Sequence, residues 1–253
     1  MTEADQALLE LLSFLEAQDY AFVTPTPETH KRALRRPRAP GPATLRDVFG
    51  WSRAFAPDEL PAEVMDIARR AGVLKRRGRL LASTLRVSTV RDRLFLHSAY
   101  PTHDENSVFL GPDSYRFADF IVRELRRAEA VERMLDIGAG AGVGGITAAG
   151  ERPGAALLMT DVNAAALRLA QVNAAHNRIP AELRIASGLD GVEGRFDLIT
   201  ANPPYIVDTH GRTYRDGGDM LGARLSLEWA QAAAERLASG GRLLLYTGSA
   251  IVE

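Results

Sequence analysis

The fold is decided by the stretch RMLDIGAGAG at residues 133–142, together with TANPPY at residues 200–205. Met134, Leu135 and Ile137 are typical of the end of a buried strand, and the glycines after them predict a turn into an alanine-rich helix. Glycine is needed in such a turn because the backbone visits positive φ. Any Cβ would also keep a ligand from lying against the amides at the helix N-terminus. The pattern therefore predicts a strand, a glycine turn and a helix that form a ligand cradle.

A dinucleotide is one ligand to weigh, because Gly140, Gly142 and Gly145 satisfy the G-x-G-x-x-G fingerprint of NAD-binding turns. Two features count against it. Asp136 stands at the end of the strand, where a carboxylate repels a pyrophosphate and can meet a cationic or hydroxyl-bearing ligand. The second feature is N-P-P-Y at residues 202–205, which follows another apolar strand and has no role in hydride transfer.

Together, the D-x-G-x-G-x-G turn that starts at Asp136 and the N-P-P-Y motif resemble the class I S-adenosylmethionine-dependent methyltransferases that methylate planar nitrogens. The resemblance covers residues 108–248, about half the chain and enough for one domain. Residues 199–206, ITANPPYI, are most similar to enzymes that methylate a release-factor glutamine, and the D-G-G loop at 207–221 resembles theirs. Similar signatures also occur in enzymes that methylate exocyclic amines of adenine or guanine in DNA and RNA. The resemblance implies a Rossmann-like, doubly wound α/β sheet.

The resemblance also implies S-adenosylmethionine as the cofactor. We expect it to lie against the glycine turn, in contact with Asp136, Gly138, Gly140 and Gly142. Asp161 stands at the tip of the second predicted strand, where a carboxylate can accept hydrogen bonds from both hydroxyls of a ribose. We therefore expect Asp161 to hold the ribose.

A segment over the cofactor is the next expected contact. In the resembled methyltransferases, a segment in the position of residues 108–115 crosses over the bound cofactor. This implies that Phe109, Gly111 and Asp113 lie near its methionine end.

The contact to the adenine ring is open. The resembled glutamine methyltransferases commonly carry an acidic residue just after the third strand, and it holds the adenine amino group. This chain departs from that pattern, with SGLD at residues 187–190. The contact is expected from Ser187, from Leu189, from the backbone or from Asp190 reaching back.

The N-P-P-Y motif suggests a mechanism. An amide or aromatic amine is a poor nucleophile because its nitrogen lone pair is delocalised, so the site has to localise that lone pair. We hypothesise that the side-chain oxygen of Asn202 and the carbonyl of Pro203 each accept one N–H of the target NH2 group. The two prolines fix where these acceptors point, and Tyr205 offers an aromatic face to a planar substrate.

Composition limits the other function classes. The chain has 253 residues, 46% of them hydrophobic, and a formal net charge of −1, so overall charge does not indicate nucleic acid binding. The absence of cysteine excludes disulfides, thiolate zinc sites and a cysteine nucleophile, and the five histidines lack metal-ligand spacing. An apolar run near the N-terminus follows Glu3 and Asp5, unlike a signal peptide, and is too short to span a bilayer. We expect an amphipathic helix at about 3–18, no membrane association and a cytoplasmic protein.

Residues 1–100 predict a smaller, winged-helix-like domain for substrate recognition, and residues 101–253 the methyltransferase domain. Helices are expected at 44–49 and 57–71, before short strands. The strands are expected at 80–85, 86–90 and 94–97. Cations gather around the last helix and the first strand: Arg69, Arg70, Lys75, Arg76, Arg77 and Arg79. They form either a surface that follows a phosphate backbone or an ordinary charged surface.

A second basic stretch follows the first helix. It predicts either a solvated helix with a proline-rich linker, at about 27–42, or an RNA-contacting arm.

The C-terminal half predicts repeated strand and helix units. Strands are expected at 157–159, 183–186, 196–201 and 242–247, and helices at 164–177 and 223–238. A complete class I sheet has two further strands, which form an antiparallel edge. Because the sequence stops after the fifth strand, we expect a missing C-terminal segment or a partner chain to cover that edge.

Three functions fit these patterns. The first is a glutamine N-methyltransferase acting on a protein such as a release factor. The second is a methyltransferase of a base amine in RNA or DNA, which would have to present an unstacked base. The third is a catalytically silent binding module that keeps the cofactor fold.

Overall fold

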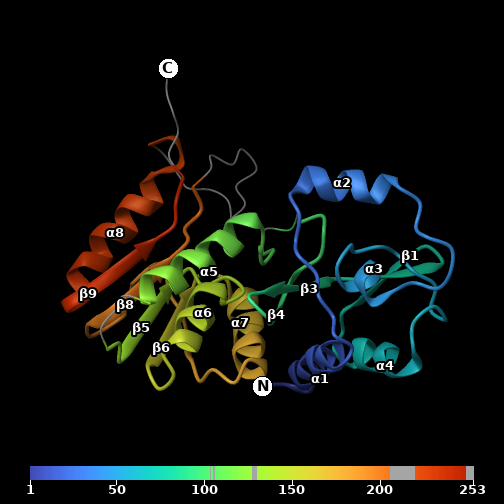
Figure 1. Ribbon diagram of the computed structural model, residues 1–253, viewed down its shortest axis with the longest axis horizontal. Coiled ribbons are helices and arrows are strands. Elements are labelled where there is room, and N and C mark those ends of the chain that lie inside the picture. Colours follow the sequence, from blue (N-terminus) through green and yellow to red (C-terminus); the bar gives the residue numbers. More distant parts are fainter. Residues whose placement is uncertain (103, 105, 127–129, 206–219, 249–253) are drawn as a thin grey trace.

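The structure is a computed structural model that describes residues 1–102, 104, 106–126, 130–205 and 220–248. Its centre is a sheet of five parallel strands in the order β7-β6-β5-β8-β9 (Figure 1). The strands are β5 Arg133–Ile137, β6 Ala156–Asp161, β7 Glu182–Ile185, β8 Phe196–Ala201 and β9 Leu237–Leu245. The doubly wound sheet expected from the sequence is confirmed.

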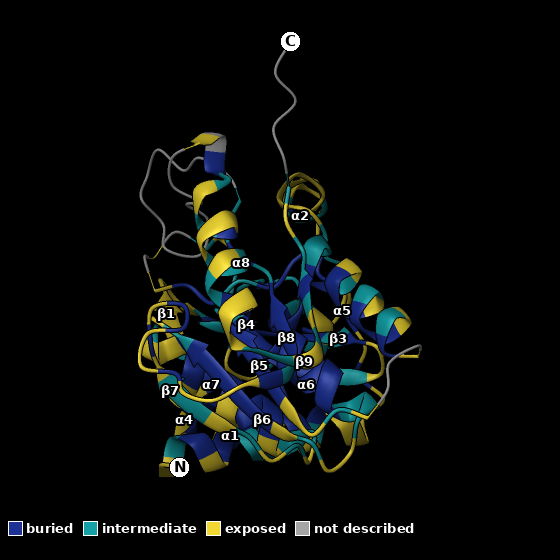
Figure 2. Cartoon of the chain, turned by 90° about the vertical axis from the view of Figure 1, so that its left-hand side faces the viewer, coloured by how far each residue is buried: buried dark blue, intermediate teal, exposed yellow. Residues whose placement is uncertain are grey.

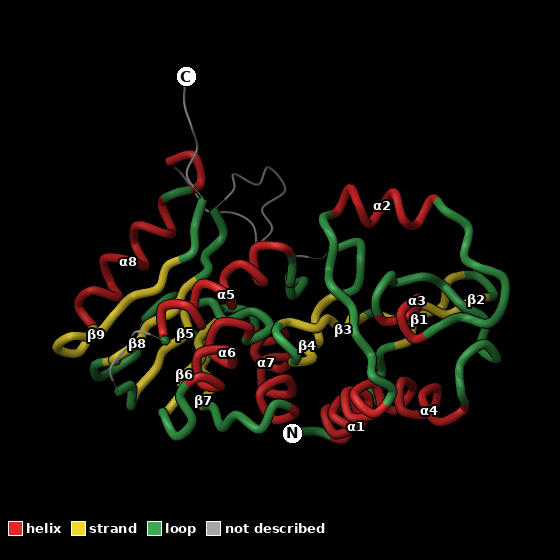
Figure 3. Tube along the Cα trace, viewed as in Figure 1, coloured by secondary structure: helices red, strands yellow, loops and turns green. Residues whose placement is uncertain are grey.

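Helices cover both faces of this sheet, as parallel strands require. On one face lie α5 Pro112–Leu125, α6 Val143–Glu151 and α7 Ala164–His176, and on the other lies α8 Arg224–Arg236 (Figures 1 and 3). The apolar residues of β5 divide between the two faces: Met134 belongs to the α6 side, whereas Leu135 belongs to the α8 side. Figure 2 shows the central strands almost entirely in the buried colour.

The strand order places the functional motifs together. The chain winds from β5 to β6 and β7 in one direction, and β8 returns to the other side of β5. The carboxyl ends of β5, β6 and β8 therefore meet where the winding direction changes, which is where open α/β sheets bind ligands.

The N-terminal part holds helices and two antiparallel hairpins, and it packs beside α7 (Figures 1 and 3). Its helices are α1 Glu3–Ala17, α2 Pro27–Arg35, α3 Leu45–Phe49 and α4 Ala62–Arg70. Its strands are β1 Leu74–Arg77, β2 Leu80–Ser83, β3 Leu85–Val90 and β4 Arg93–Ser98. The buried core continues from this part into the methyltransferase-like half, so the division at residue 100 remains a proposal.

The starts of α4 and β9 differ from the sequence expectation, and strand β1 is an additional element. Helix α4 begins at Ala62, after Pro61 at its N-cap. Strand β1 was not expected, because a charged run lacks apolar alternation; it forms by pairing with β2 across a turn at Gly78, φ +64°. Strand β9 begins at Leu237, because that residue pairs with Phe196.

Gly240 and Gly241, which stand between the helix expected at 223–238 and the strand expected at 242–247, lie inside β9. Gly240 has φ +76°, and the pairing register with β8 shifts in this segment. A Cβ on Gly241 would lie 2.8 Å from the carbonyl oxygen of Phe196. The glycines therefore allow an irregular strand to approach β8. Among the described residues, β9 pairs with β8 alone.

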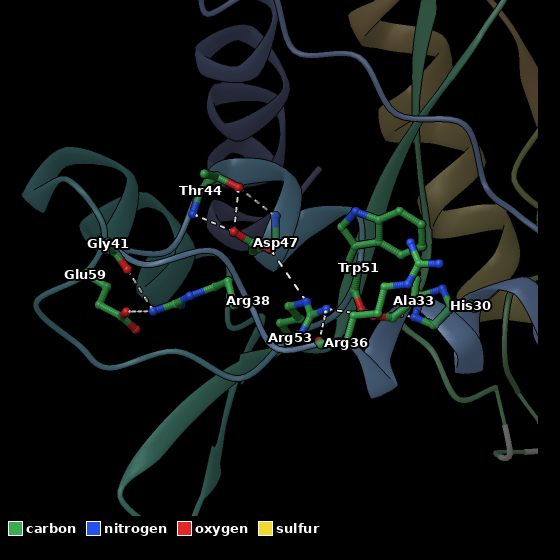
Figure 4. A network of polar contacts seen from close by, with 10 residues as sticks. All are labelled: His30, Ala33, Arg36, Arg38, Gly41, Thr44, Asp47, Trp51, Arg53 and Glu59. Atoms are coloured by element: carbon green, nitrogen blue, oxygen red, sulfur yellow. Dashed lines mark hydrogen bonds and ion pairs between the residues drawn. The ribbon is translucent and has the colours of Figure 1, made fainter.

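Helix α2 is held by a polar network around Arg53 (Figure 4). Arg53 Nη2 donates to the carbonyls of Ala33 and Arg36, at 2.9 and 3.1 Å, where α2 ends. Its Nε lies 3.6 Å from Asp47, whose carboxylate also caps α3 through the N–H of Thr44. A cation on the last carbonyls of a helix is a stabilising C-terminal contact. Arg53 therefore joins α2 to α3.

We expect Arg53→Met to lower the free energy of unfolding by about 1–3 kcal/mol, because two carbonyls and a largely buried carboxylate lose a charged partner. Urea denaturation measures this change. The control is Lys31→Met, which breaks an exposed pair with Glu28 and should cost less than about 0.5 kcal/mol. Equal losses in the two variants would contradict the anchoring role of Arg53.

Candidate functional site

The turn after β5 has the conformation that its glycines predicted. Gly138, Gly140 and Gly142 have φ of +63°, +55° and +82°, and Gly142 is the N-cap of α6. Protein fills the Cβ positions of Gly138 and Gly142, but a Cβ on Gly140 would meet no atom within 4 Å. The outer side of the turn is therefore open at Gly140, which fits a ligand lying against the backbone.

Asp136 supports this turn from beneath. It is 2% exposed; its Oδ2 accepts the N–H of Gly145 at 2.8 Å, and its Oδ1 accepts the hydroxyl of Thr200 at 2.7 Å. Burial raises the pKa of Asp136 to about 6, against the opposing effect of these two hydrogen bonds, and the charge of Asp161 adds to the rise. Direct ligand contact by Asp136 remains a prediction.

Asp161 closes the turn from the tip of β6. Its Oδ2 accepts the N–H of Gly140 at 2.8 Å, and its Oδ1 accepts the N–H of Asn163 at 2.8 Å. Each carboxylate oxygen has a second lone pair, so the group can still accept from a ribose. Burial also raises the pKa of Asp161. The side chain of Asn163 accepts the N–H of Ala165 at 2.9 Å and so caps α7.

The loop after β7 lies near the glycine turn through Trp229 on α8. The indole lies beside both Gly138 and Gly188, where it fills the Cβ positions of these glycines. Ser187 is exposed at the same loop, and the carbonyl of Gly188 accepts the hydroxyl of Thr160 at 3.0 Å. The structure thus brings the predicted adenine-side loop to the turn, while the contact by Ser187 remains a prediction.

The N-P-P-Y motif follows β8 and meets the start of α5. Asn202 Nδ2 donates to Asp113 Oδ2 at 3.3 Å, whereas Asn202 Oδ1 is buried and has no hydrogen-bond partner among the described residues. Pro203 is buried and Tyr205 half-buried, with its ring 6.5 Å from that of Tyr246. Burial raises the pKa of Asp113 and also that of Tyr205. The motif therefore presents a buried acceptor without a donor.

The segment before α5 is compact. The ring of Phe109 lies beside Gly111, so that a Cβ there would collide with it, and Asp113 lies in the first turn of the helix. Asp113 thus reaches Asn202 from the segment that the sequence indicated, and Phe109 packs on Gly111 in the same segment. Contact of Phe109 and Asp113 with a cofactor remains a prediction. The D-G-G sequence of the loop at 207–221 lies outside the described residues.

Three site residues were missed by sequence reasoning: Thr200, Trp229 and Tyr246. Thr200 gave a weak signal, because it is a polar residue in a buried strand two positions before Asn202. Trp229 and Tyr246 gave none, because their contacts depend on how α8 and β9 pack.

In the described ranges, no three or more His, Asp or Glu side chains form a group that suits a metal ion. No helix in that part of the chain is long and apolar enough to cross a membrane.

The raised pKa of Asp136 predicts a pH-dependent stability. Its pKa is about 6 in the folded chain and 3.8 ordinarily. Between these pH values the folded state binds more protons than the unfolded state, so the contribution of Asp136 to the free energy of unfolding falls as pH rises. Between pH 4 and pH 7, the free energy of unfolding of Asp136→Asn should therefore rise by about 3 kcal/mol relative to that of wild type, because the two pKa values differ by about 2 units. Urea titrations across this range measure the gain, and parallel profiles for the two proteins would contradict it.

Comparison with known proteins places this geometry in a family. Residues 103–251 match the family described as methyltransferase small domain. The release factor glutamine methyltransferase of Neisseria gonorrhoeae is 30% identical over 206 residues, which are 76% of this chain and 71% of that protein. The ribosomal RNA small subunit methyltransferase C of Haemophilus influenzae is 37% identical over 86 residues, 33% of this chain and 26% of that protein.

A solved structure agrees in fold. The S-adenosylmethionine-dependent methyltransferase of Agrobacterium tumefaciens aligns with a TM-score of 0.51 and 17% identity, over 70% of this chain and 55% of that one. The chain spans 50–55% of the length of other release factor glutamine methyltransferases that it matches. Because the family match covers more than half of the residues, the chain belongs to the methyltransferase small domain family of S-adenosylmethionine-dependent methyltransferases.

Proposed function

We propose that this chain is an N-methyltransferase that acts on a planar amide or amino nitrogen, with the glutamine side chain of a release-factor-like protein as its leading substrate. The observation that carries the proposal is the buried Oδ1 of Asn202, which has no donor. Leaving a buried acceptor without a donor costs about 1–3 kcal/mol. A substrate N–H that enters the site supplies the missing donor.

The proposed chemistry follows from what this acceptor does to a nitrogen. Asn202 Oδ1 and the carbonyl of Pro203 each accept one N–H of the target NH2 group. Both hydrogen bonds favour a pyramidal nitrogen with a localised lone pair, so they strengthen as the reaction proceeds. Tyr205 offers its ring to the planar group. No general base is needed to start the reaction.

Asp113 sets the direction of the Asn202 amide. Because Nδ2 donates to the carboxylate of Asp113, the amide oxygen is the atom left to accept from the substrate. Asp113 therefore acts as a positioning residue, in addition to the expected place near the methionine end of the cofactor.

The cofactor fits the open side of the glycine turn. S-adenosylmethionine, when bound, supplies an electrophilic methyl group on its sulfonium. Gly140, whose Cβ position is open, lets it approach the backbone, while Gly138 and Gly142 supply the positive φ that the turn needs. Asp161 uses its free lone pairs for the ribose. The loop at Ser187 is proposed to hold the adenine ring.

The relatives favour a protein glutamine over a nucleic acid base. The N. gonorrhoeae relative acts, by its name, on a release factor. Its alignment spans 206 residues, more than residues 101–253 contain, so it extends into the N-terminal part of this chain. The alignment with the ribosomal RNA methyltransferase is much shorter. We place this activity in the cytoplasm, which agrees with a sequence that lacks cysteine.

A base amine in RNA or DNA is the second candidate, because of the hairpin of β1 and β2. Its four cations are exposed, and none of them makes an ion pair with a described residue. They are Lys75, Arg76, Arg77 and Arg79. RNA affinity that falls steeply with salt and depends on these side chains would favour this candidate.

We expect Asn202→Ala to keep the wild-type affinity for S-adenosylhomocysteine and to lose methyl transfer by about 100-fold or more, as with the loss of one transition-state hydrogen bond. Transfer of a labelled methyl group to a glutamine-containing release factor measures the rate, and calorimetry measures the affinity. Asn177→Ala, which removes an amide bonded to Leu94 on β4, is the control. An active Asn202→Ala enzyme would overturn the assignment.

We expect Asp161→Ala to weaken S-adenosylmethionine binding by about 10–100-fold, because a charged acceptor of two hydroxyls is lost. Calorimetric titration with S-adenosylmethionine, S-adenosylhomocysteine and NAD measures this, with exposed Glu193→Ala as the control. Unchanged affinity in Asp161→Ala would remove the ribose role. Binding of NAD alone would mean that the turn serves a dinucleotide.

A further inference from the structure

A buried guanidinium lies away from the glycine turn, where the N-terminal part meets α5. Arg86, at the start of β3, is 4% exposed, and its Nε and Nη2 have no hydrogen-bond partner in the part of the chain that the structure describes. No carboxylate of the described residues pairs with it. The ring of Phe22 lies 5.8 Å from its Cζ, and this cation–π contact offsets only part of the cost of burying a charge.

Arg86 nevertheless remains charged at neutral pH. Burial lowers its pKa to about 10, against the opposing effect of nearby Tyr115, Tyr20 and Tyr100. A charged group buried without a counter-ion is rare in proteins, because desolvation of the charge is not compensated. The free Nε–H and Nη2–H lie on one edge of the guanidinium, and this edge is the one that binds both oxygens of a carboxylate or phosphate.

Tyr115, in the first turn of α5, supplies a third donor. Its hydroxyl accepts the N–H of Thr24 at 2.8 Å, and no group in the described part of the chain accepts its proton. Some polar groups nearby satisfy one another: Ser88 bonds His97 at 2.8 Å and Thr24 at 2.6 Å. Among the described residues, the donors that lack an acceptor here are on Arg86 and Tyr115, and Nδ1 of His30 is also buried without a partner.

A surface hollow leads toward these donors. Phe22 and Tyr115 line a hollow of about 490 Å³, and the exposed side chain of Arg46 also lines it. Its other charged side chains are Arg91 and Asp119, which pair at 2.7 Å, and Asp92. Phe22 links the hollow to Arg86, because it lines the hollow and its ring also lies 5.8 Å from Cζ of Arg86.

We propose that Arg86 and Tyr115 form a binding site for an oxyanion, a carboxylate or a phosphate group, which enters from this hollow past Phe22. Two oxygens of the anion accept from Nε and Nη2 of Arg86, and one accepts the hydroxyl proton of Tyr115. Tyr115 lies two residues after Asp113 in the first turn of α5. An anion bound there contacts the same helical turn that orients Asn202, but the proposal does not depend on the methyltransferase reaction.

Calorimetric titration of the whole chain with inorganic phosphate and with acetate, at constant ionic strength, tests the proposal. We expect saturable binding of at least one anion, weakened about tenfold or more by Arg86→Met, since a bidentate charged contact is lost. Tyr115→Phe keeps the ring and should weaken binding several-fold. Arg35→Met, which removes an exposed cation on α2, should bind like wild type. Thermal unfolding shows whether each variant is folded.

Comparing phosphate with acetate identifies the class of anion. Binding of phosphate but not acetate indicates a phosphate-bearing ligand, and the reverse indicates a carboxylate. Absence of saturable binding by wild type, or equal binding by wild type and a folded Arg86→Met, overturns the proposal. If Arg86→Met does not fold, Tyr115→Phe decides: unchanged affinity in that variant also overturns it.

Discussion

One backbone N–H of the glycine turn and one in the first turn of α6 are held by carboxylates from the neighbouring strands β6 and β5, and the rest of the site depends on these bonds. Asp136 accepts from Gly145 and Asp161 accepts from Gly140, so the turn is fixed without help from a ligand. Thr200 donates to Asp136 and thereby ties the end of β8 to the same network. The carboxyl ends of β5, β6 and β8 are therefore held together before a cofactor binds. Such preorganisation reduces the ordering cost of binding.

A second set of bonds fixes the N-terminal part against this turn. The buried side chain of Asn173 on α7 accepts the N–H of Leu96 at 2.8 Å and donates to the carbonyls of Leu96 and Ala141, at 3.0 and 2.9 Å. Ala141 belongs to the glycine turn itself. Asp5 on α1 also pairs with Arg168 on α7 at 2.6 Å. The part proposed to recognise the substrate is thus attached directly to the part proposed to hold the cofactor.

Helix α5 lies between two groups of unsatisfied polar atoms. Asp113 in its first turn directs Asn202, whose oxygen lacks a donor. Tyr115 in the same turn lies near Arg86, whose Nε and Nη2 lack an acceptor among the described residues. Native proteins satisfy nearly all buried polar atoms, so each exception indicates a ligand or a functional constraint. The exception at Asn202 is an acceptor and suits an N–H donor, whereas the exception at Arg86 is a pair of donors and suits an anion.

The sequence by itself determined the parts of this protein that depend on local chemistry. Apolar runs located the parallel strands, the glycines located the turn, and Asn202 with its prolines located the motif at the carboxyl edge of the sheet. The start of β9 was missed, because its glycines make an irregular strand only when β8 is beside them. The contact between Asp113 and Asn202 was not foreseen, because 89 positions separate the two residues. Such contacts, and the free edge of Arg86, exist only after the helices have packed, since periodicity and turn chemistry carry no information about which distant side chains meet.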